Sequence, residues 1–416
     1  MRQPPREETQ LVQSIFVDTQ IPRLLAVKVL RPLLPGIIWS PISSARMADL
    51  AVPALPGPRW LRVSNRQCGI CGTDLSLLFV RGSPGIAPAA LPANSRIFLG
   101  HEVVSDVVEV GEGVTRFRVG DRVVMGSRHT GRNCFSQEIE PPCPYCAQGQ
   151  TRLCENASLG VGPEGVGGGW SEGYTAHETE VHGVPDDLDD DQALFVEPMA
   201  IALHAVLRHR PQPGDHVLVV GAGTIGLLTA QAARAVEPGC KVTVLARYAH
   251  QAESARRLGV ENVVRGGDIY AELAGVTGAR HYRAPMNRGM LLGGFEVVYD
   301  CVGGQRTIAD ALRWARAGGA VVMVGITLSD LKVDLNPIWY QEVDLIGAGF
   351  FGMEDWEGAR ADTYDIVIDM MREGRLQHDG MITHRFAFSQ YKRAITTASD
   401  KHSGSIKVIL TFAERG

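Results

Sequence analysis

The feature that most constrains the fold is the glycine-rich segment GAGTIG at residues 221–226, which fits the pattern G-x-G-x-x-G. It follows the apolar run 217–220 and opens a stretch with helical periodicity. In that setting the first glycine allows a tight turn, the second lets the backbone approach a pyrophosphate, and the third lets the helix pack closely on the strand. Unpaired N–H groups at the start of the helix then bind the phosphates. The residues predicted to bind a dinucleotide here are Gly221, Gly223, Thr224, Ile225 and Gly226.

Alternation of apolar strands and helices continues after this loop, which predicts a parallel, doubly wound Rossmann sheet over residues 197–348. A chain of 416 residues is too long for one compact core, so a second domain is expected. Short valine-rich runs broken by glycines between residues 97 and 125 predict a small β-barrel. The final strand, SIKVIL, is expected to return to that barrel. The predicted barrel domain therefore comprises residues 21–196 and 349–416.

The N-terminal part of the chain is less informative. Residues 1–20 are predicted to be an extension to which the sequence assigns no role. The apolar stretch Ala26–Leu30 is interpreted as a strand, and prolines break up the sequence after it.

The end of the second Rossmann strand bears on the choice of cofactor. NAD-binding proteins usually carry an acidic residue there to bind the ribose hydroxyls, about 20 residues after the glycine loop. Here that place is taken by Ala246, and Arg247 follows it. Because an arginine can bind a 2′-phosphate through charge-assisted hydrogen bonds, the sequence favours NADP over NAD.

One set of candidate metal ligands is spread along the chain. Cys71 lies in the segment CGICGTD, and His101 and Glu102 follow about 30 residues later. A thiolate, an imidazole and a carboxylate can form a tetrahedral zinc site with an open position, which a catalytic metal requires. Glu197, at the predicted domain junction, is a second candidate for the carboxylate.

A second set of candidate ligands lies in the Pro- and Gly-rich loop 134–154. Cys143, Cys146 and Cys154 are close in sequence, which is typical of a structural zinc site. The fourth ligand is predicted to be Cys134, since thiolate is the commoner structural ligand. Glu140 is the rival candidate.

Composition excludes several classes of function. The net charge of −5 leaves no basic excess with which to neutralise nucleic-acid phosphates. No apolar run reaches the length of a membrane span, and the N-terminus lacks the apolar core of a secretory signal. We therefore expect a cytoplasmic protein with neither a nucleic-acid nor a membrane partner.

Together these motifs resemble the medium-chain dehydrogenase/reductase superfamily, in its zinc-dependent alcohol, polyol and threonine dehydrogenase branch. The segments that carry the resemblance are CGICGTDL, FLGHEVVSDVVEVGEGVTRFRVGDRVV, CPYCAQGQTRLCEN, VEPMAIALHAV, VLVVGAGTIGLL and FEVVYDCVGG. The resemblance implies a GroES-like barrel that carries a catalytic zinc, beside a Rossmann domain. It implies that Cys71 and His101 bind this zinc and that Glu102 or Glu197 supplies a carboxylate. It also implies that Thr73 relays the substrate's proton and that Asp74 orients His101.

The predicted function is reversible hydride transfer between a secondary alcohol, polyol or sugar and a nicotinamide dinucleotide, in a homodimer or homotetramer. Two alternatives stay open: a zinc-free quinone- or enoyl-type reductase on the same fold, and an inactive cofactor-binding protein. The substrate pocket is expected to be lined by loops near residues 76–98, 160–172 and 350–356.

Overall fold

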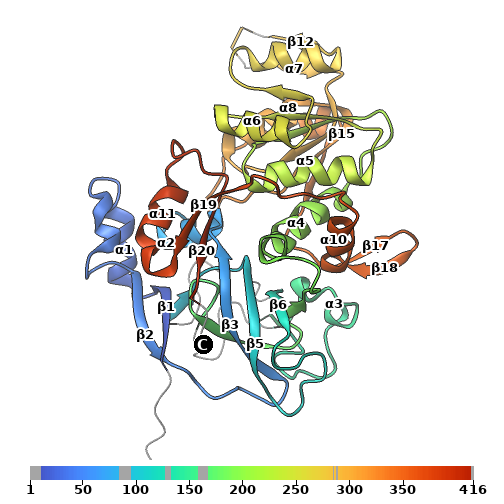
Figure 1. Cartoon of the computed structure of the whole chain (residues 1–416). Helices are drawn as coiled ribbons and strands as arrows, with labels where there is room; N and C mark the ends of the chain where they lie inside the picture. The colour runs from blue at the N-terminus through green and yellow to red at the C-terminus, as the bar shows by residue number, and fades with distance from the viewer. Residues whose placement is uncertain are drawn as a thin grey trace, which may run out of the picture.

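The chain was analysed as a computed structural model, which describes residues 11–83, 95–126, 133–157, 167–283, 285–286 and 289–413. Two bodies of structure are joined by the long helix α4 (Asp190–Arg208). Figure 1 shows the barrel in the lower half of the molecule and the Rossmann sheet with its helices in the upper half. Parts of the loops predicted to line the substrate pocket, residues 84–94 and 160–166, lie outside the described residues.

The lower body contains the β-structure predicted for the barrel domain. Its main sheet has the order β19-β20-β3-β5-β6-β8, and β7 also pairs with β3. The strands are β3 (Trp60–Gly69), β5 (Val103–Val110), β6 (Arg122–Met125), β7 (Gly173–His177), β8 (Val181–Gly183), β19 (Ile382–Ala387) and β20 (Lys407–Thr411). Because β20 pairs with β3, the C-terminal strand returns to the barrel as expected. The helices of this body are α2 (Gly72–Leu78), α3 (Pro144–Ala147) and α11 (Tyr391–Ser399), with short 3-10 turns η4 (Thr151–Leu153) and η5 (Phe388–Gln390).

The upper body is the predicted parallel sheet, with strand order β11-β10-β9-β14-β15-β16. Its strands are β9 (His216–Val220), β10 (Lys241–Leu245), β11 (Asn262–Val264), β14 (Phe295–Asp300), β15 (Ala315–Met323) and β16 (Asp344–Gly347). Its helices are α5 (Thr224–Val236), α6 (Ala249–Arg257), α7 (Ile269–Thr277), α8 (Gln305–Trp314) and α9 (Asn336–Tyr340). Two hairpins are added: β12 (Arg280–Tyr282) with β13 (Met290–Leu292), and β17 (Met353–Trp356) with β18 (Ala359–Asp362). Strand β18 leads directly into α10 (Thr363–Arg372).

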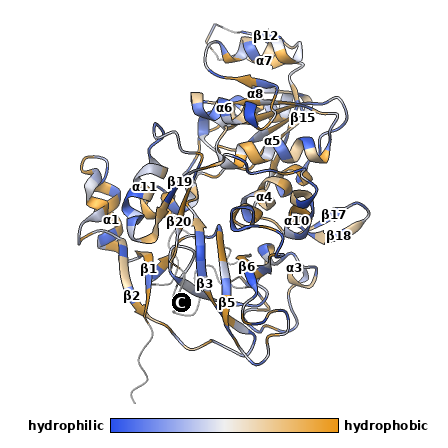
Figure 2. Cartoon of the chain, viewed as in Figure 1, coloured by the Kyte–Doolittle hydropathy of each residue, from blue (hydrophilic) through white to orange (hydrophobic). Residues whose placement is uncertain are grey.

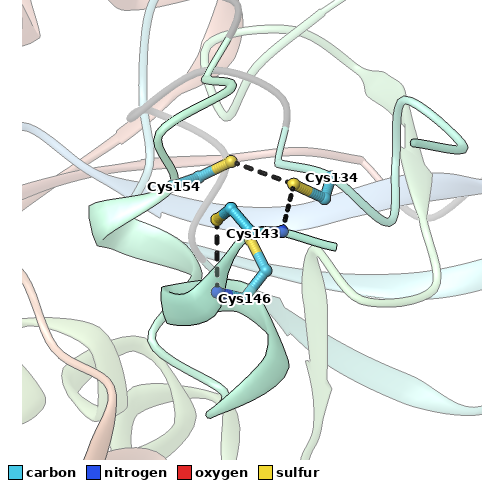
Figure 3. A group of neighbouring side chains, drawn as sticks. All are labelled: Cys134, Cys143, Cys146 and Cys154. Atoms are coloured by element: carbon cyan, nitrogen blue, oxygen red, sulfur yellow. Dashed lines mark hydrogen bonds between the residues drawn. The ribbon is translucent and has the colours of Figure 1, made fainter. Parts of the chain in front are cut away.

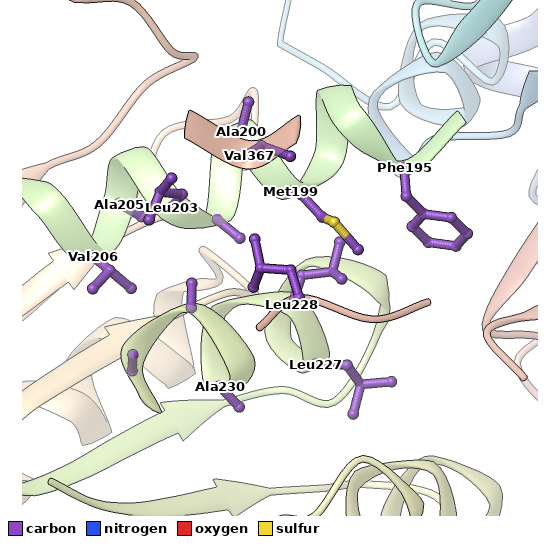
Figure 4. Close-up of a cluster of buried hydrophobic side chains, with 14 of the residues drawn as sticks. Phe195, Met199, Ala200, Leu203, Ala205, Val206, Leu227, Leu228, Ala230 and Val367 are labelled. Atoms are coloured by element: carbon purple, nitrogen blue, oxygen red, sulfur yellow. The ribbon is translucent and has the colours of Figure 1, made fainter. Parts of the chain in front are cut away.

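Both faces of the Rossmann sheet are covered, because successive side chains of its central strand enter different cores. Val217 and Val219 of β9 pack in a core with α4 and α5, whereas Leu218 and Val220 pack in a second core with α8. Figure 4 shows the first of these cores, where apolar side chains of α4 and α5 interdigitate beside Val367 of α10. This packing fixes the glycine loop at the start of α5 relative to α4. The predicted domain boundary at residues 196–197 falls inside α4.

The N-terminal region differs from what the sequence led us to expect. Leu11–Asp18, placed in the extension, forms strand β1 of a three-stranded sheet with β2 (Ala45–Ala51) and β4 (Arg96–Phe98). The strand predicted over Ala26–Leu30 is wrong, since these residues belong to helix α1 (Ile21–Leu30). A short run of apolar residues does not by itself distinguish a strand from a helix, and here Pro22 at the start of the helix was the missed signal.

Hydrophobic residues are concentrated in the elements that form the buried cores, as the colouring of Figure 2 shows for α4 and the Rossmann strands. Among the described residues, none of the helices has the length and apolar character needed to cross a bilayer.

Candidate active site and metal centres

The start of α2 holds the first metal-ligand candidate. Cys71 is the N-cap residue of this helix, and Asp74 in the first turn accepts a hydrogen bond from the Cys71 backbone N–H at 3.4 Å. The other oxygen of Asp74 accepts from the backbone N–H of Gly100 at 2.9 Å. Asp74 therefore links the helix that carries Cys71 to the segment that carries His101.

His101 and Glu102 lie just before β5, and side-chain ligand atoms of Cys71, His101 and Glu102 all lie within 4.8 Å of one another. The Nδ1 atom of His101 lies 3.4 Å from Asp74 Oδ1, which leaves Nε2 as the nitrogen for a metal. Burial acts to raise the pKa of Asp74, but the charge of His101 and the N–H donors lower it overall. Asp74 is thus an ionised orienting group beside the imidazole.

Thr73 faces this group, because its hydroxyl donates a hydrogen bond to Cys71 Sγ at 3.2 Å. The hydroxyl predicted to relay a proton therefore lies beside the candidate metal ligands. Its side chain is only partly buried, as is that of Cys71.

Glu102 is held by a residue that the sequence analysis missed. The Lys407 ammonium, on β20, donates to both carboxylate oxygens of Glu102, at 2.6 and 2.5 Å. Both side chains are almost fully buried, with residue exposures of 1% for Glu102 and 3% for Lys407. Burial acts to lower the pKa of Lys407, but the charge of Glu102 raises it overall, so the lysine stays protonated. A lysine inside an otherwise apolar strand was the available signal, since such a group is buried only with a partner.

Glu197, the rival carboxylate, is buried on α4 and is not part of the group formed by Cys71, His101 and Glu102. Its charge nevertheless contributes to raising the pKa of Lys407, which places it in the same neighbourhood. Lys407 therefore contacts Glu102 directly and also senses the charge of Glu197.

A second missed residue is Gly69, the last residue of β3. A Cβ atom added there would lie 2.0 Å from Glu102 Oε2, so only glycine leaves room for this carboxylate. A glycine inside a strand often marks the close approach of another group, which was the sequence signal.

The glycine loop has the geometry of a phosphate cradle. Gly221 adopts a φ of 97°, and a Cβ at Gly226 would lie 1.8 Å from the carbonyl oxygen of Gly221. Gly223, in contrast, faces open space, because a Cβ there would meet nothing within 4 Å. The first and third glycines thus serve the turn and the packing, and the second leaves room for a phosphate at the start of α5.

The remaining predicted cofactor residues lie around this loop. Ile225 is partly buried in the first turn of α5, and the Thr224 hydroxyl donates to the carbonyl of Ile406 at 2.9 Å. Because Ile406 precedes Lys407, β20 connects the cofactor loop to the candidate metal group. Arg247 is exposed after β10 and lies 5.5 Å from the ring centre of Tyr248. Within the described part of the chain, Arg247 has no ion-pair partner.

The four cysteines of the loop lie close together. Ligand atoms of Cys134, Cys143, Cys146 and Cys154 all lie within 4.8 Å of one another, whereas Glu140 is exposed and outside the group. Figure 3 shows the four side chains pointing toward a common centre. The Sγ atoms of Cys134 and Cys154 are 3.6 Å apart without forming a disulfide.

Backbone donors favour the thiolate form of Cys143. The N–H groups of Cys143 and Cys146 donate to Cys134 Sγ and Cys143 Sγ, at 3.3 and 3.5 Å. The Cys146 N–H is the main cause that lowers the pKa of Cys143 to about 6. Because a metal binds the thiolate form, this donor set fits a zinc ion.

Comparisons with known proteins agree with this geometry. Residues 57–186 match the alcohol dehydrogenase GroES-like domain, and residues 224–363 match the zinc-binding dehydrogenase domain. L-idonate 5-dehydrogenase of Vitis vinifera is 28% identical over 378 residues, which cover 89% of this chain and 93% of that protein. L-threonine 3-dehydrogenase of Legionella pneumophila is 29% identical, over 88% of this chain and 96% of its own.

Among solved structures, 2R,3R-butanediol dehydrogenase from Bacillus subtilis is similar, with a TM-score of 0.69 and 25% identity. The match covers 96% of this chain and 99% of that one. A protein described as a zinc-binding dehydrogenase from Sinorhizobium meliloti, solved with NADP, has a TM-score of 0.67 and 25% identity over 97% of this chain and 99% of its own.

The chain is a zinc-type medium-chain dehydrogenase. In this dehydrogenase the match to the GroES-like domain includes Cys71, His101 and Glu102, and the second match begins within the glycine loop, at residue 224. Lys407 and Gly69 complete the surroundings of Glu102.

Proposed function

We propose that this dehydrogenase uses a catalytic zinc and prefers NADP, and that it oxidises secondary alcohols, polyols or sugars reversibly. The observation that carries the proposal is the convergence of Cys71, His101 and Glu102 within 4.8 Å, with the Thr73 hydroxyl hydrogen-bonded to Cys71 Sγ. A thiolate, an imidazole and a carboxylate are the donors expected at a catalytic zinc site with an open position.

Cys71 and His101 would hold the zinc, with Glu102 or Glu197 as the carboxylate partner. Bound there, the metal would supply Lewis acidity that lowers the pKa of a substrate hydroxyl. Asp74 fixes the His101 ring through Nδ1, and Lys407 fixes the Glu102 carboxylate. Since Lys407 occupies both oxygens of Glu102, the carboxylate can reach a metal only by sharing an oxygen or by leaving the lysine.

The contact of the Thr73 hydroxyl with Cys71 Sγ supports a role for Thr73 in proton transfer. Its partly buried hydroxyl would accept the substrate's proton by hydrogen bond and pass it toward solvent. The hydride would go to the nicotinamide, which supplies the redox chemistry when the cofactor is bound. The open space at Gly223 and the start of α5 support the pyrophosphate.

Arg247 supports the preference for NADP. It is exposed, without a carboxylate partner among the described residues, and it follows the buried Ala246 at the strand end. A 2′-phosphate can therefore gain a charge-assisted hydrogen bond from this guanidinium without first breaking an ion pair.

The four-cysteine loop would hold a second, structural zinc. We also propose a cytoplasmic location, since a reducing compartment preserves these thiols.

We further propose that the chain forms a homodimer or a homotetramer. The edge strand β16 and the exposed side chains of Trp339 and Tyr340 on α9 support self-association.

The test is a spectrophotometric screen of NADP and NAD against a panel of alcohols and polyols, with the Cys71→Ser variant as control. We expect faster reduction of NADP than of NAD with a secondary alcohol or polyol, and loss of activity in the variant. Full activity in Cys71→Ser would overturn the zinc mechanism. Absence of zinc after gentle purification would favour the zinc-free reductase instead, and failure with every substrate despite bound zinc would favour an inactive cofactor-binding protein.

A further inference from the structure

An unusually long connection joins two paired strands at the N-terminus. β1 and β2 are antiparallel, with Val17 opposite Ala45, so residues 18–44 form the link between them. Hairpin connections usually have two to five residues, so closing this pair does not require such a segment. The link contains α1 and the 3-10 turn η1 (Pro35–Trp39). Figure 1 shows α1 at the outer edge of the molecule, beside α11.

The outward side of this link is apolar. On α1, Leu24 and Val27 are buried, whereas Ile21, Leu25 and Val29 recur every four residues on one face and are 67%, 51% and 63% exposed. Leu33 and Leu34 follow and are 81% and 58% exposed. We call these five exposed residues the apolar ridge.

Polar residues are missing from the exposed positions around the ridge. Between residues 21 and 42, the exposed positions are occupied by isoleucine, leucine, valine, proline and glycine alone. The outward face of a surface helix normally carries charged and polar side chains instead. Figure 2 shows hydrophobic segments along α1 in this outer position. An apolar strip of this kind marks an interaction surface.

The charge around the ridge is positive. Residues 19–48 contain four basic residues and no aspartate or glutamate, in a chain whose net charge is −5. The guanidinium groups of Arg31 and Arg81 each lie 5.0 Å from the ring centre of Phe79. Neither forms an ion pair with another described residue. Burial and the charge of Arg31 lower the pKa of Arg81, and burial and the charge of Arg81 lower that of Lys401. We call Arg31, Arg81 and Lys401 the basic cluster.

We propose that the apolar ridge and the basic cluster bind the surface of a membrane that contains anionic lipids. A helix of ten residues is about 15 Å long, half the thickness of the hydrocarbon core, so α1 would lie in the interface plane. The ridge would enter the boundary between headgroups and acyl chains, and the basic cluster would pair with headgroup phosphates.

Charge distinguishes this occupant from a second copy of the chain. Two copies joined symmetrically through the ridge would bring one basic cluster toward the other, and Asp18, the acidic residue of the link, already pairs with Arg23 at 3.2 Å. An anionic headgroup layer neutralises the cluster directly. The proposal revises the prediction of no membrane partner, which considered only spanning segments and secretory signals.

The ridge lies near the place where the two bodies of the dehydrogenase meet. Lys28 of α1 donates to the carbonyls of Val80 and Gly82, just after α2, at 3.4 and 2.5 Å. The next residue, Ser83, donates its N–H to the carbonyl of Leu328 in the Rossmann domain at 2.6 Å. Docking through α1 would therefore hold this junction close to the bilayer.

The experiment measures co-sedimentation of the full chain with vesicles of phosphatidylglycerol and phosphatidylcholine. The ridge variant is Leu25→Gln with Val29→Gln, and its matched control is Val108→Gln with Val119→Gln, where the exposures are 46% and 60%. We expect the wild type and the control to bind, and the ridge variant to bind about tenfold less tightly, because two apolar side chains no longer leave water.

Charge is tested separately with vesicles of phosphatidylcholine alone and with Arg31→Gln. Both changes should weaken binding severalfold, since each basic residue near an anionic surface contributes roughly a fivefold gain. Arg118→Gln changes a side chain that is 90% exposed and does not belong to the basic cluster, so this variant should bind like the wild type.

Two results would overturn the proposal. One is that the wild type fails to bind anionic vesicles, and the other is that the ridge variant binds as tightly as its control. Thermal melts and sedimentation velocity accompany the assay. If the ridge variant instead dissociates an oligomer while no form binds vesicles, the ridge is an interface between copies, and the membrane proposal is wrong.

Discussion

Cys71, His101 and Glu102 come from two segments separated by α2 and offer three kinds of donor atom, whereas the four-cysteine group comes from the single loop 134–154 and offers only thiols. In the loop, the backbone N–H groups of neighbouring cysteines support the sulfur atoms directly. In the first group, support comes from distant elements, through Asp74 on α2 and Lys407 on β20.

This difference predicts how each group of ligands responds to mutation. A closed set of four thiols satisfies zinc completely and stabilises the loop around it. A mixed set with an open position can take a substrate, but its geometry depends on the packing of several elements. Mutations in the first group should therefore affect rate, and mutations in the second should affect stability.

The largest expected effect is on catalysis. His101→Ala should lower kcat/KM by roughly 10³-fold, because Lewis-acid stabilisation is worth several kcal/mol. The melting temperature should change little, since Asp74 keeps its backbone donors from Gly100 and Cys71. Steady-state kinetics and a thermal melt check this, with His209→Ala as the control. A lower melting temperature with unchanged specific activity in His101→Ala would reverse the assignment of roles.

The four-cysteine group should show the opposite pattern. Cys146→Ser should lower the melting temperature by roughly 5 °C or more, at about 2–4 °C per kcal/mol, because the loop loses its metal cross-link. Activity per folded molecule should stay close to that of the wild type. Differential scanning calorimetry with and without a zinc chelator measures this. An unchanged melting temperature, together with an unaltered response to the chelator, would exclude a structural metal in the loop.

A smaller effect is expected from Gly69→Ala, which tests how far the first group depends on packing. Its Cβ would overlap Glu102 Oε2, so the carboxylate must move by about 1 Å or more, which can cost about 100-fold in rate. Gly72→Ala is the matched control, because a Cβ there meets nothing within 4 Å. Equal kinetics for the two variants would show that the position of Glu102 does not matter.

The smallest effect concerns the cofactor. Arg247→Ala should raise KM for NADP about tenfold and leave KM for NAD unchanged, because one charge-assisted hydrogen bond to the 2′-phosphate is lost. Arg256→Ala serves as the control, because Arg256 is also exposed but lies on α6, away from the end of β10. A parallel rise for both cofactors would mean that Arg247 does not select NADP.

Local patterns were enough to predict much of this molecule. The glycine loop, its flanking strand and helix, and the cysteine-rich loop each lie within a short stretch of chain, so spacing carries the information. The parallel sheet followed from repeated alternation of apolar strands and helices. In the loop, the geometry favours Cys134 over Glu140 for a reason that sequence does not contain, namely that the carboxylate is exposed.

Features that depend on contacts between distant segments could not be predicted. The Glu102–Lys407 pair joins residues 305 positions apart, and the close approach of Glu102 to Gly69 depends on the pairing of β3 with β5. The choice between Glu102 and Glu197 had no answer in the sequence, because both are single acidic residues next to predicted elements. The helix α1 was mistaken for a strand because a short apolar run does not distinguish the two, and because its exposed positions are apolar as well as its buried ones.

The most direct test of the central claim is to measure bound zinc and activity in the same samples of wild type, Cys71→Ser and Cys146→Ser. We predict about two zinc ions per wild-type chain and about one in each variant, with activity abolished only in Cys71→Ser. If Cys71→Ser retained both its zinc and its activity, the assignment of the catalytic metal to Cys71 and His101 would be contradicted.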